Sequence, residues 1–376
     1  MHSILHACRA AVPASKLIPR IANGSSRAFS RSSASLRGKS LPEFLEASTP
    51  ALSAELAILN SQILLPLHLT HEQQQLVYKE KNRAALETDP VPITIGNVTL
   101  PLKHIDQNRM PNRWRTLKAI VDQSSTPEDW ENVLRMMEGF RNAGVHVKGN
   151  RIEKIIRQMS EAGMHHLILK AAQRADKTDF KLDNPGIVYR AFGSMYDKAA
   201  DSGWDLEETR KALSMSEQLL ELMEDKEHLG KKEVGPHDLR ASPLVIAVPT
   251  GLTAAIAKMF KDEDHFKVAK YASRLVDTLE QNNGEFLEIT IPQMNNELKE
   301  KRNFFQNTPI FSLMILQRAL KTSSKILGAD MPKANVAKTV SDKLSELFKE
   351  IEENIDDSRQ VLFRKHLEKY QKLEEV

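Results

Sequence analysis

From residue 111 onward, hydrophobic positions recur three or four residues apart, which is the period of an α-helix. This pattern predicts a series of helices joined by short connections. The expected helices cover residues 111–123, 127–143, 150–162, 164–175, 184–200 and 205–226. The second has a strong start signal, because Thr126 can cap it and Pro127 suits its first turn. Helices of this length with short links pack as antiparallel hairpins, so region 111–228 is expected to form a helical-hairpin array.

The segment before this array, residues 41–110, predicts a helical lead-in and a small β-hairpin. Its first part has the pattern of two or three amphipathic helices interrupted by Pro50 and Pro66. In the stretch 92–101, apolar and polar residues alternate on both sides of Gly96-Asn97. Two short strands around two turn-forming residues are a hairpin signal. An extended connector is the alternative interpretation of this stretch.

Two more helical regions follow, at 235–330 and 332–376. The apolar run 243–260 is broken by Pro249 and Gly251 and is predicted to be a buried, kinked pair of helices. No uninterrupted apolar run reaches the roughly 18 residues that cross a bilayer, so no membrane span is expected.

The C-terminal region, 332–376, has apolar positions along one helical face and predicts one long amphipathic helix or two. Such a helix docks across the body of its own protein or pairs with a partner helix. Aromatic residues are only 6% of the chain, and proline and glycine are sparse. The fold class expected is therefore all-α: an α-hairpin array or solenoid-like helical bundle.

The N-terminal 36 residues have the composition of a mitochondrial transit peptide. Seven basic residues and no acidic one occur in 1–40, together with many serines. The pattern Arg27-Ala28-Phe29 with Ser32 resembles two-step mitochondrial processing, with cuts after Ala28 and then after Leu36. A mitochondrial matrix location is the expectation, and a disordered Ser/Arg tail is the alternative.

Removal of this segment changes what the charge of the chain means. The whole chain has a formal charge of +3, whereas residues 41–376 carry about −4. A nucleic-acid interface must therefore come from a local patch rather than from the overall charge. The single cysteine, Cys8, also lies in the expected transit peptide. The remaining chain has no disulfide and no cysteine-ligated metal.

The sequence contains no recognisable catalytic motif. A glycine-rich phosphate loop, a G-x-S-x-G elbow, an H-E-x-x-H motif and a dinucleotide fingerprint are all missing. Adjacent His165 and His166 would point about 100° apart on a helix, which disfavours a shared metal. The acidic run at 261–266 has no matching ligands elsewhere and is expected to be a solvated helix start. We expect a protein that is not an enzyme and has no cofactor or metal.

A local basic region between residues 103 and 157 is the best positive signal. Residues 101–190 contain 16 Lys and Arg residues and 11 Asp and Glu residues, which gives a net charge of about +5. The candidate RNA-binding residues are Lys103, Arg109, Arg113, Trp114, Arg115, Lys118, Lys148, Arg151, Lys154 and Arg157. Such cations can hold phosphates, and an interleaved Trp can stack on an unpaired base. The alternative is a solvated helix face with Trp114 in the core.

A weak repeat runs through the array. "GVHVKGNRIEKII" from Gly144 and "DFKLDNPGIVYRA" from Asp179 align with a 35-residue offset. The segment "WENVLRMMEGFRNAGVHVKGNRIEKIIRQMSEAGM" resembles a pentatricopeptide unit, and the resemblance covers about 130–205. No run of several units follows, so a nucleotide code read by successive repeats is not expected.

The Ser/Arg-rich N-terminus and the helical, only locally basic body resemble fungal mitochondrial ribosomal proteins. This resemblance implies a non-catalytic component of the mitochondrial ribosome. Its partners would be rRNA, held by the basic helices, and ribosomal proteins, held by apolar helix faces. The alternative is a free matrix factor with pentatricopeptide-like units that acts in translation, or an assembly scaffold for respiratory complexes.

Overall fold

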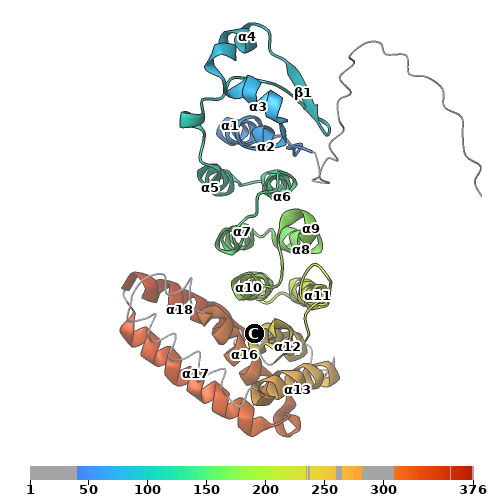
Figure 1. The fold of residues 1–376 in the computed structure, drawn as a ribbon. Helices are drawn as coiled ribbons and strands as arrows, with labels where there is room; N and C mark the ends of the chain where they lie inside the picture. Colours follow the sequence, from blue (N-terminus) through green and yellow to red (C-terminus); the bar gives the residue numbers. More distant parts are fainter. Residues whose placement is uncertain are drawn as a thin grey trace, which may run out of the picture. The chain divides into compact units, whose positions relative to one another are not determined.

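Helices joined by short loops make up most of the chain that can be described (Figure 1). The computed structural model describes residues 40–233, 235, 238–259, 265–281, 309–355 and 357–374. The expected transit peptide, 1–36, lies outside these residues, as does most of the acidic run at 261–266.

The predicted hairpin array is present. Most helix ends lie within two residues of those expected from the sequence, but the last helix ends at Leu222 and not at 226. Its helices are α5 (Arg113–Gln123), α6 (Pro127–Asn142), α7 (Gly149–Glu161), α8 (His165–Gln173), α9 (Ala175–Thr178), α10 (Pro185–Asp201) and α11 (Leu206–Leu222). The segment expected as one helix at 164–175 is divided into α8 and α9 at Arg174. Thr126 caps α6 as predicted, in a reciprocal capping box with Asp129.

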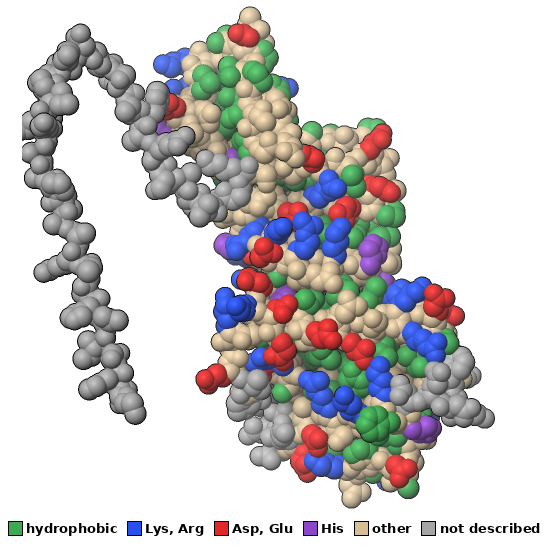
Figure 2. Space-filling view, turned by 90° about the vertical axis from the view of Figure 1, so that its right-hand side faces the viewer, with side chains coloured by type: hydrophobic (Ala, Val, Ile, Leu, Met, Phe, Trp, Pro, Cys, Tyr) green, Lys and Arg blue, Asp and Glu red, His purple; other side chains and the backbone are tan. Residues whose placement is uncertain are grey.

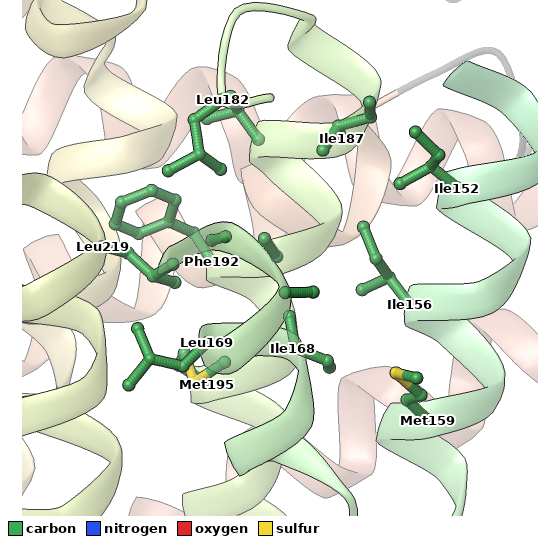
Figure 3. Packing of buried hydrophobic residues seen from close by; sticks show 14 of the residues in the cluster. Ile152, Ile156, Met159, Ile168, Leu169, Leu182, Ile187, Phe192, Met195 and Leu219 are labelled. Atoms are coloured by element: carbon green, nitrogen blue, oxygen red, sulfur yellow. The ribbon is translucent and has the colours of Figure 1, made fainter. Parts of the chain in front are cut away.

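Successive helix pairs stack on one another (Figure 1). Helix α7 contacts α5 on one side and α10 on the other, while α8 contacts α6 and α11. The α7 contribution to the core is Ile152, Ile155, Ile156 and Met159, all at most 1% exposed. They meet apolar side chains of α8 and α10, among them Ile168 and Phe192 (Figure 3). A single helix pair could not bury this face, so each pair depends on the next.

The lead-in is more continuous than its prolines suggested. Helix α1 (Pro50–Ile58), a π-helical segment (Leu59–Leu64) and α2 (Leu65–His68) follow one another without a break. Pro50 begins this helix instead of interrupting it, at the position where a missing N–H costs nothing. The Leu65 N–H bonds to the Asn60 carbonyl five residues back. This wider turn accommodates Pro66, so the predicted interruption there was wrong.

By length and composition alone, one helix of the described residues, 50–68, could cross a bilayer, with a mean hydropathy of 1.2. The core helix of a globular protein can meet the same criteria. Leu52, Leu59 and Leu64 of this helix are fully buried. The helix contacts α5, so its apolar side contributes to the protein core in this structure.

After α2, the chain forms α3 (His71–Tyr78) and α4 (Arg83–Thr88) and then the predicted β-hairpin. Strands β1 (Pro92–Ile95) and β2 (Val98–Pro101) pair antiparallel, with Ile95 opposite Val98. Gly96 takes a positive φ of 66° in the two-residue turn, as glycine does there most easily. The hairpin interpretation is confirmed, and the extended connector is excluded.

An extended segment, residues 40–48, runs along α6 and is held there by polar side chains of that helix. We call it the strap. The buried Asn132 accepts a hydrogen bond from the Leu45 N–H at 2.7 Å and donates one to the Leu45 carbonyl at 3.1 Å. At one end Asp129 accepts from the Ser48 N–H and hydroxyl, and at the other Asn142 donates to Ser40. Asp129 and Asn132 are three residues apart, about one helical turn, and Asn142 lies ten residues beyond Asn132.

A single glycine lets the strap lie close to this helix. A Cβ atom added at Gly139 would come within 2.8 Å of Pro42 Cγ. Any side chain at this position would therefore push the strap away from α6. The sequence pattern gave no indication of the strap, because its backbone contacts involve residues about 90 positions away.

The C-terminal half contains α12 (Pro243–Met259), α13 (His265–Gln281), α16 (Ile310–Leu327), α17 (Ala334–Asn354) and α18 (Asp357–Gln371). The predicted helix pair at 243–260 is instead one helix with Pro249 inside it. Its residues 243–257 are all buried, and it contacts α10, α11, α13 and α16. Packing on these neighbours outweighs the cost of the internal proline.

The C-terminal region forms two helices that dock on the body. Helix α17 contacts α13 and α16, and α18 contacts α10 and α16. At the α18 contact, Lys369 pairs with Asp197 at 2.7 Å and with Asp201 at 2.8 Å. The Tyr370 hydroxyl donates to Asp197, and its ring lies edge-on to Tyr196. Docking within the chain is thus the arrangement of α18.

The carboxylate of Asp129 is expected to contribute to the free energy of unfolding through its hydrogen bonds to the strap. Burial would raise its pKa, but hydrogen bonds from Ser48, Thr126 and Ser125 lower the pKa from 3.8 to about 2. A depressed pKa stabilises the folded state above pH 3.8, and this stabilisation is lost as the pH falls through 2. We expect Asp129→Asn to lower the free energy of unfolding at pH 7 by about 2 kcal/mol. The difference should shrink between pH 4 and pH 2 in urea titrations.

The matched control is Asp176→Asn, which removes an exposed carboxylate on α9 and should leave stability within about 0.5 kcal/mol of the parent. The role given to this carboxylate would be contradicted if Asp129→Asn left the free energy of unfolding unchanged at pH 7. A loss of unfolding free energy that stayed constant down to pH 2 would contradict it as well.

Candidate nucleic-acid interface

The first turns of α5 and α7 bring together the centre of the predicted basic region. Asn112 caps α5 by accepting hydrogen bonds from the N–H groups of Trp114 and Arg115, at 3.0 and 3.2 Å. Arg113 and Arg115 project from this turn and are exposed. Lys148 is the residue before α7 and is also exposed, and Arg151 lies in the first turn of that helix.

A cation–π contact joins these two turns. The guanidinium carbon of Arg151 lies 3.9 Å from the centroid of the Trp114 ring. Trp114 is half-buried, and its ring makes a tilted contact with Phe140 of α6 at 5.7 Å. Arg151 Nη1 is buried without a hydrogen-bond partner among the described residues. The aromatic ring that the sequence offered for base stacking is engaged within the protein.

Several of the ten predicted residues are neutralised by nearby carboxylates. Lys118 and Lys154 both pair with Asp122, at 2.9 and 2.7 Å. Burial would raise the pKa of Asp122, but hydrogen bonds from Lys154, Lys118 and Gln158 lower the pKa to about 2. Arg109 lies 3.7 Å from Asp106, and Arg157 lies 3.9 Å from Glu161. These four cations have acidic partners on the protein itself.

The other cations have no acidic partner within ion-pair distance in the part of the chain that the structure describes. They are Lys103, Arg113, Arg115, Lys148 and Arg151. Four of these lie at the adjoining N-terminal ends of α5 and α7, and we call them the unpaired cluster: Arg113, Arg115, Lys148 and Arg151. No Asp or Glu occurs in 112–118 or 144–152. The structure thus divides the predicted basic region into a paired part and an unpaired part.

Arg151, Lys154 and Arg157 are spaced three residues apart along α7 and make different contacts. Arg151 stacks on Trp114 and Lys154 reaches Asp122, so both are turned toward α5. Arg157 pairs within its own helix.

Lys103 lies outside the two turns and lines a groove of about 880 Å³ beside β2, together with Arg109. The same groove is lined by apolar side chains, including Leu45, Leu56 and Leu100.

The face that α6, α8, α9 and α11 turn to solvent is different. Basic and acidic side chains are intermixed on it (Figure 2). Between α6 and α8, Lys170 pairs with Glu131 at 2.7 Å. At the end of α8, Arg174 pairs with Glu138 of α6 at 2.8 Å. Such pairs neutralise each other, so this face lacks the local positive charge of the unpaired cluster.

The two adjacent histidines lie as the helical spacing predicted. His165 is buried, its Nε2 atom is 3.3 Å from the Ser160 hydroxyl, and burial lowers its pKa. His166 is exposed. Among the described residues there is no group of three or more His, Cys, Asp or Glu side chains that could hold a metal ion.

A family model described as mitochondrial ribosomal protein mS27 matches residues 27–375. The small ribosomal subunit protein mS27 of Neurospora crassa is 26% identical over 252 residues, which cover 62% of this chain and 64% of the relative. The resemblance to fungal mitochondrial ribosomal proteins, first suggested by the N-terminus and the helical pattern, is confirmed. The chain belongs to the mitochondrial ribosomal protein mS27 family.

Proposed function

We propose that this chain is a non-catalytic structural component of the small subunit of the mitochondrial ribosome and works in the mitochondrial matrix. The observation that carries this proposal is the family match, which runs through the lead-in, the hairpin array and the C-terminal helices. The name of the Neurospora crassa relative supplies the subunit. A stacked array with large side surfaces suits such a role, because it can contact several neighbours at once.

The basic region is proposed to hold rRNA through phosphate contacts. Its exposed cations lie on helices whose positions are fixed by the array, so they present charge in a defined arrangement. Phosphate contacts position a protein on RNA and need no sequence reading. The absence of a longer repeat series in the sequence agrees with binding of this kind.

Neighbouring proteins are proposed to bind away from the first turns of α5 and α7. The groove beside β2 has an apolar part, which includes Leu45, Leu56 and Leu100, next to charged side chains such as Lys103 and Asp106. Val361, on the outer side of α18, is 69% exposed, so a partner helix could cover this helix even though its other side docks on α10. A surface of this kind, apolar with a polar rim, is typical of sites that bind proteins.

Sedimentation of mitochondrial lysate tests the proposed function. We expect the C-terminally tagged chain to migrate with the small ribosomal subunit in a sucrose gradient and to stay there after a high-salt wash, because many contacts hold it. Blotting for the tag and for rRNA of both subunits gives the readout. A soluble pool at the top of the gradient, or migration with a respiratory complex, would favour the free-factor or scaffold alternative and contradict the proposal.

Residues 1–36 are proposed to be the transit peptide that brings the chain to the matrix. N-terminal sequencing of the tagged protein from mitochondria should find Arg37 as the first residue, with a minor species that begins at Phe29. Import with the N-terminus intact, beginning at Met1 or His2, would exclude a cleaved presequence.

A further inference from the structure

We propose that the unpaired cluster binds the sugar–phosphate backbone of double-helical RNA, without stacking on bases. This inference rests on the proposed function, since it takes rRNA as the partner. It goes further by selecting four of the ten candidate residues and by naming the form of RNA that they fit.

The first step is the local charge balance. The cluster places four cations on two adjoining helical turns, and the sequence of both turns is free of Asp and Glu. Lys118 and Lys154, one to two turns farther along the same helices, share the Asp122 carboxylate instead. A phosphate near those lysines would compete with a carboxylate whose pKa is already low. A phosphate near the cluster meets four cations that have no carboxylate partner within ion-pair distance among the described residues. The nearest acidic residue in the α7 sequence, Glu153, is half-buried, and burial raises its pKa. The cluster is therefore expected to have the higher affinity for polyanions.

The second step is the fixed position of Arg151. Its guanidinium is held over the Trp114 ring, and its Nη1 atom has no hydrogen-bond partner among the described residues. Because Nη1 is buried, a phosphate would be bound by the rest of the guanidinium, whose orientation the Trp114 ring fixes. The guanidinium carbon of Arg113 lies 5.9 Å from the same ring centroid. The ring therefore orders the cations and does not serve as a platform for a base.

The third step concerns the kind of RNA. Proteins that bind single strands without sequence preference use exposed aromatic rings on which bases stack. Between residues 103 and 157 the Phe, Tyr and Trp side chains are Trp114, Trp130 and Phe140. The exposed ring of His146 is held by Asp179, with its Nδ1 atom 2.7 Å from the carboxylate. Trp130 is 3% exposed and Phe140 is fully buried, while Trp114 is covered by Arg151. Stacking a base on Trp114 would compete with its present contacts. Helical RNA presents phosphates on its outside and is recognised largely by shape, so it needs no such ring.

The experiment compares variants of equal charge in RNA binding by fluorescence anisotropy, with the chain purified from mitochondria. The probes are a 20-base-pair RNA duplex and a single strand of the same length. The cluster variant is R113Q/R115Q/K148Q, which keeps Arg151 on its ring. The control, R83Q/K211Q/K333Q, removes three positive charges from surface ion pairs outside the basic region. Circular dichroism checks that each variant is folded.

We expect the cluster variant to bind the duplex at least about tenfold more weakly and the control to stay within about threefold of the parent. The slope of log affinity against log salt should become shallower by about three units in the cluster variant, at about 0.9 per lost phosphate contact. The triple variant of paired cations, R109Q/K118Q/R157Q, should lose less than the cluster variant. Equal losses in all three variants would overturn the proposal, because affinity would then follow net charge alone.

A second variant tests the form of RNA. Trp114→Phe keeps an aromatic ring under Arg151 but offers a poorer stacking surface. We expect the parent to prefer the duplex, and this substitution to change binding of either probe by less than about twofold. A tenfold loss of single-strand affinity would identify Trp114 as a base-stacking residue and reject the proposal. A competition experiment adds polyglutamate or unlabelled duplex at equal charge concentration. If polyglutamate displaces the labelled duplex as effectively as the unlabelled duplex does, the cluster would be assigned to an acidic protein instead.

Sedimentation of the same variants separates this proposal from the proposed function. If the parent chain migrates with the small subunit but the cluster variant binds duplex normally, only the assignment of the cluster fails. If the parent chain does not migrate with the small subunit, the ribosomal role fails whatever the binding data show.

Discussion

The stacking of each helix pair on the next is the interaction on which the rest of the structure depends. Helix α7 shows this most clearly, because its apolar side chains are buried only by the neighbours on both sides. The same stacking brings the first turn of α7 to the first turn of α5, where Arg151 reaches Trp114. The arrangement of surface cations is therefore a consequence of core packing. A change in the α5–α7 contact would alter both stability and the proposed RNA contact.

The strap shows a second way in which this fold is held together. Most of the array is stabilised by apolar contacts between helices, whereas residues 40–48 are held through backbone hydrogen bonds to Asp129 and Asn132. These contacts tie the beginning of the described chain to α6, about 90 residues away in the sequence. The strap begins four residues after the cleavage site expected at Leu36. The processed N-terminus would thus continue directly into an ordered part of the protein.

Local patterns in the sequence predicted the parts of the fold that depend on local physics. Periodicity and the Thr126-Pro127 signal were enough for the helices of the array, and Gly96-Asn97 was enough for the hairpin. Pro66 and Pro249 were misread as breaks, because a π-helical turn and dense packing accommodated them. The candidate interface was predictable only as a region. Lys154 and its partner Asp122 lie 32 positions apart, so no local pattern could show which cations are neutralised.

The central claim is that the α5–α7 edge faces rRNA, and directed hydroxyl-radical probing tests it most directly. The single cysteine, Cys8, lies in the expected transit peptide, so a new cysteine in the mature chain would be unique. The N150C substitution places a cysteine next to the unpaired cluster, and an iron chelate is attached to it. In assembled small subunits this chelate should cleave both strands of an rRNA helix. The same probe on E346C, an exposed position of α17, should cleave none. Fully incorporated N150C protein that gives no rRNA cleavage would contradict the account.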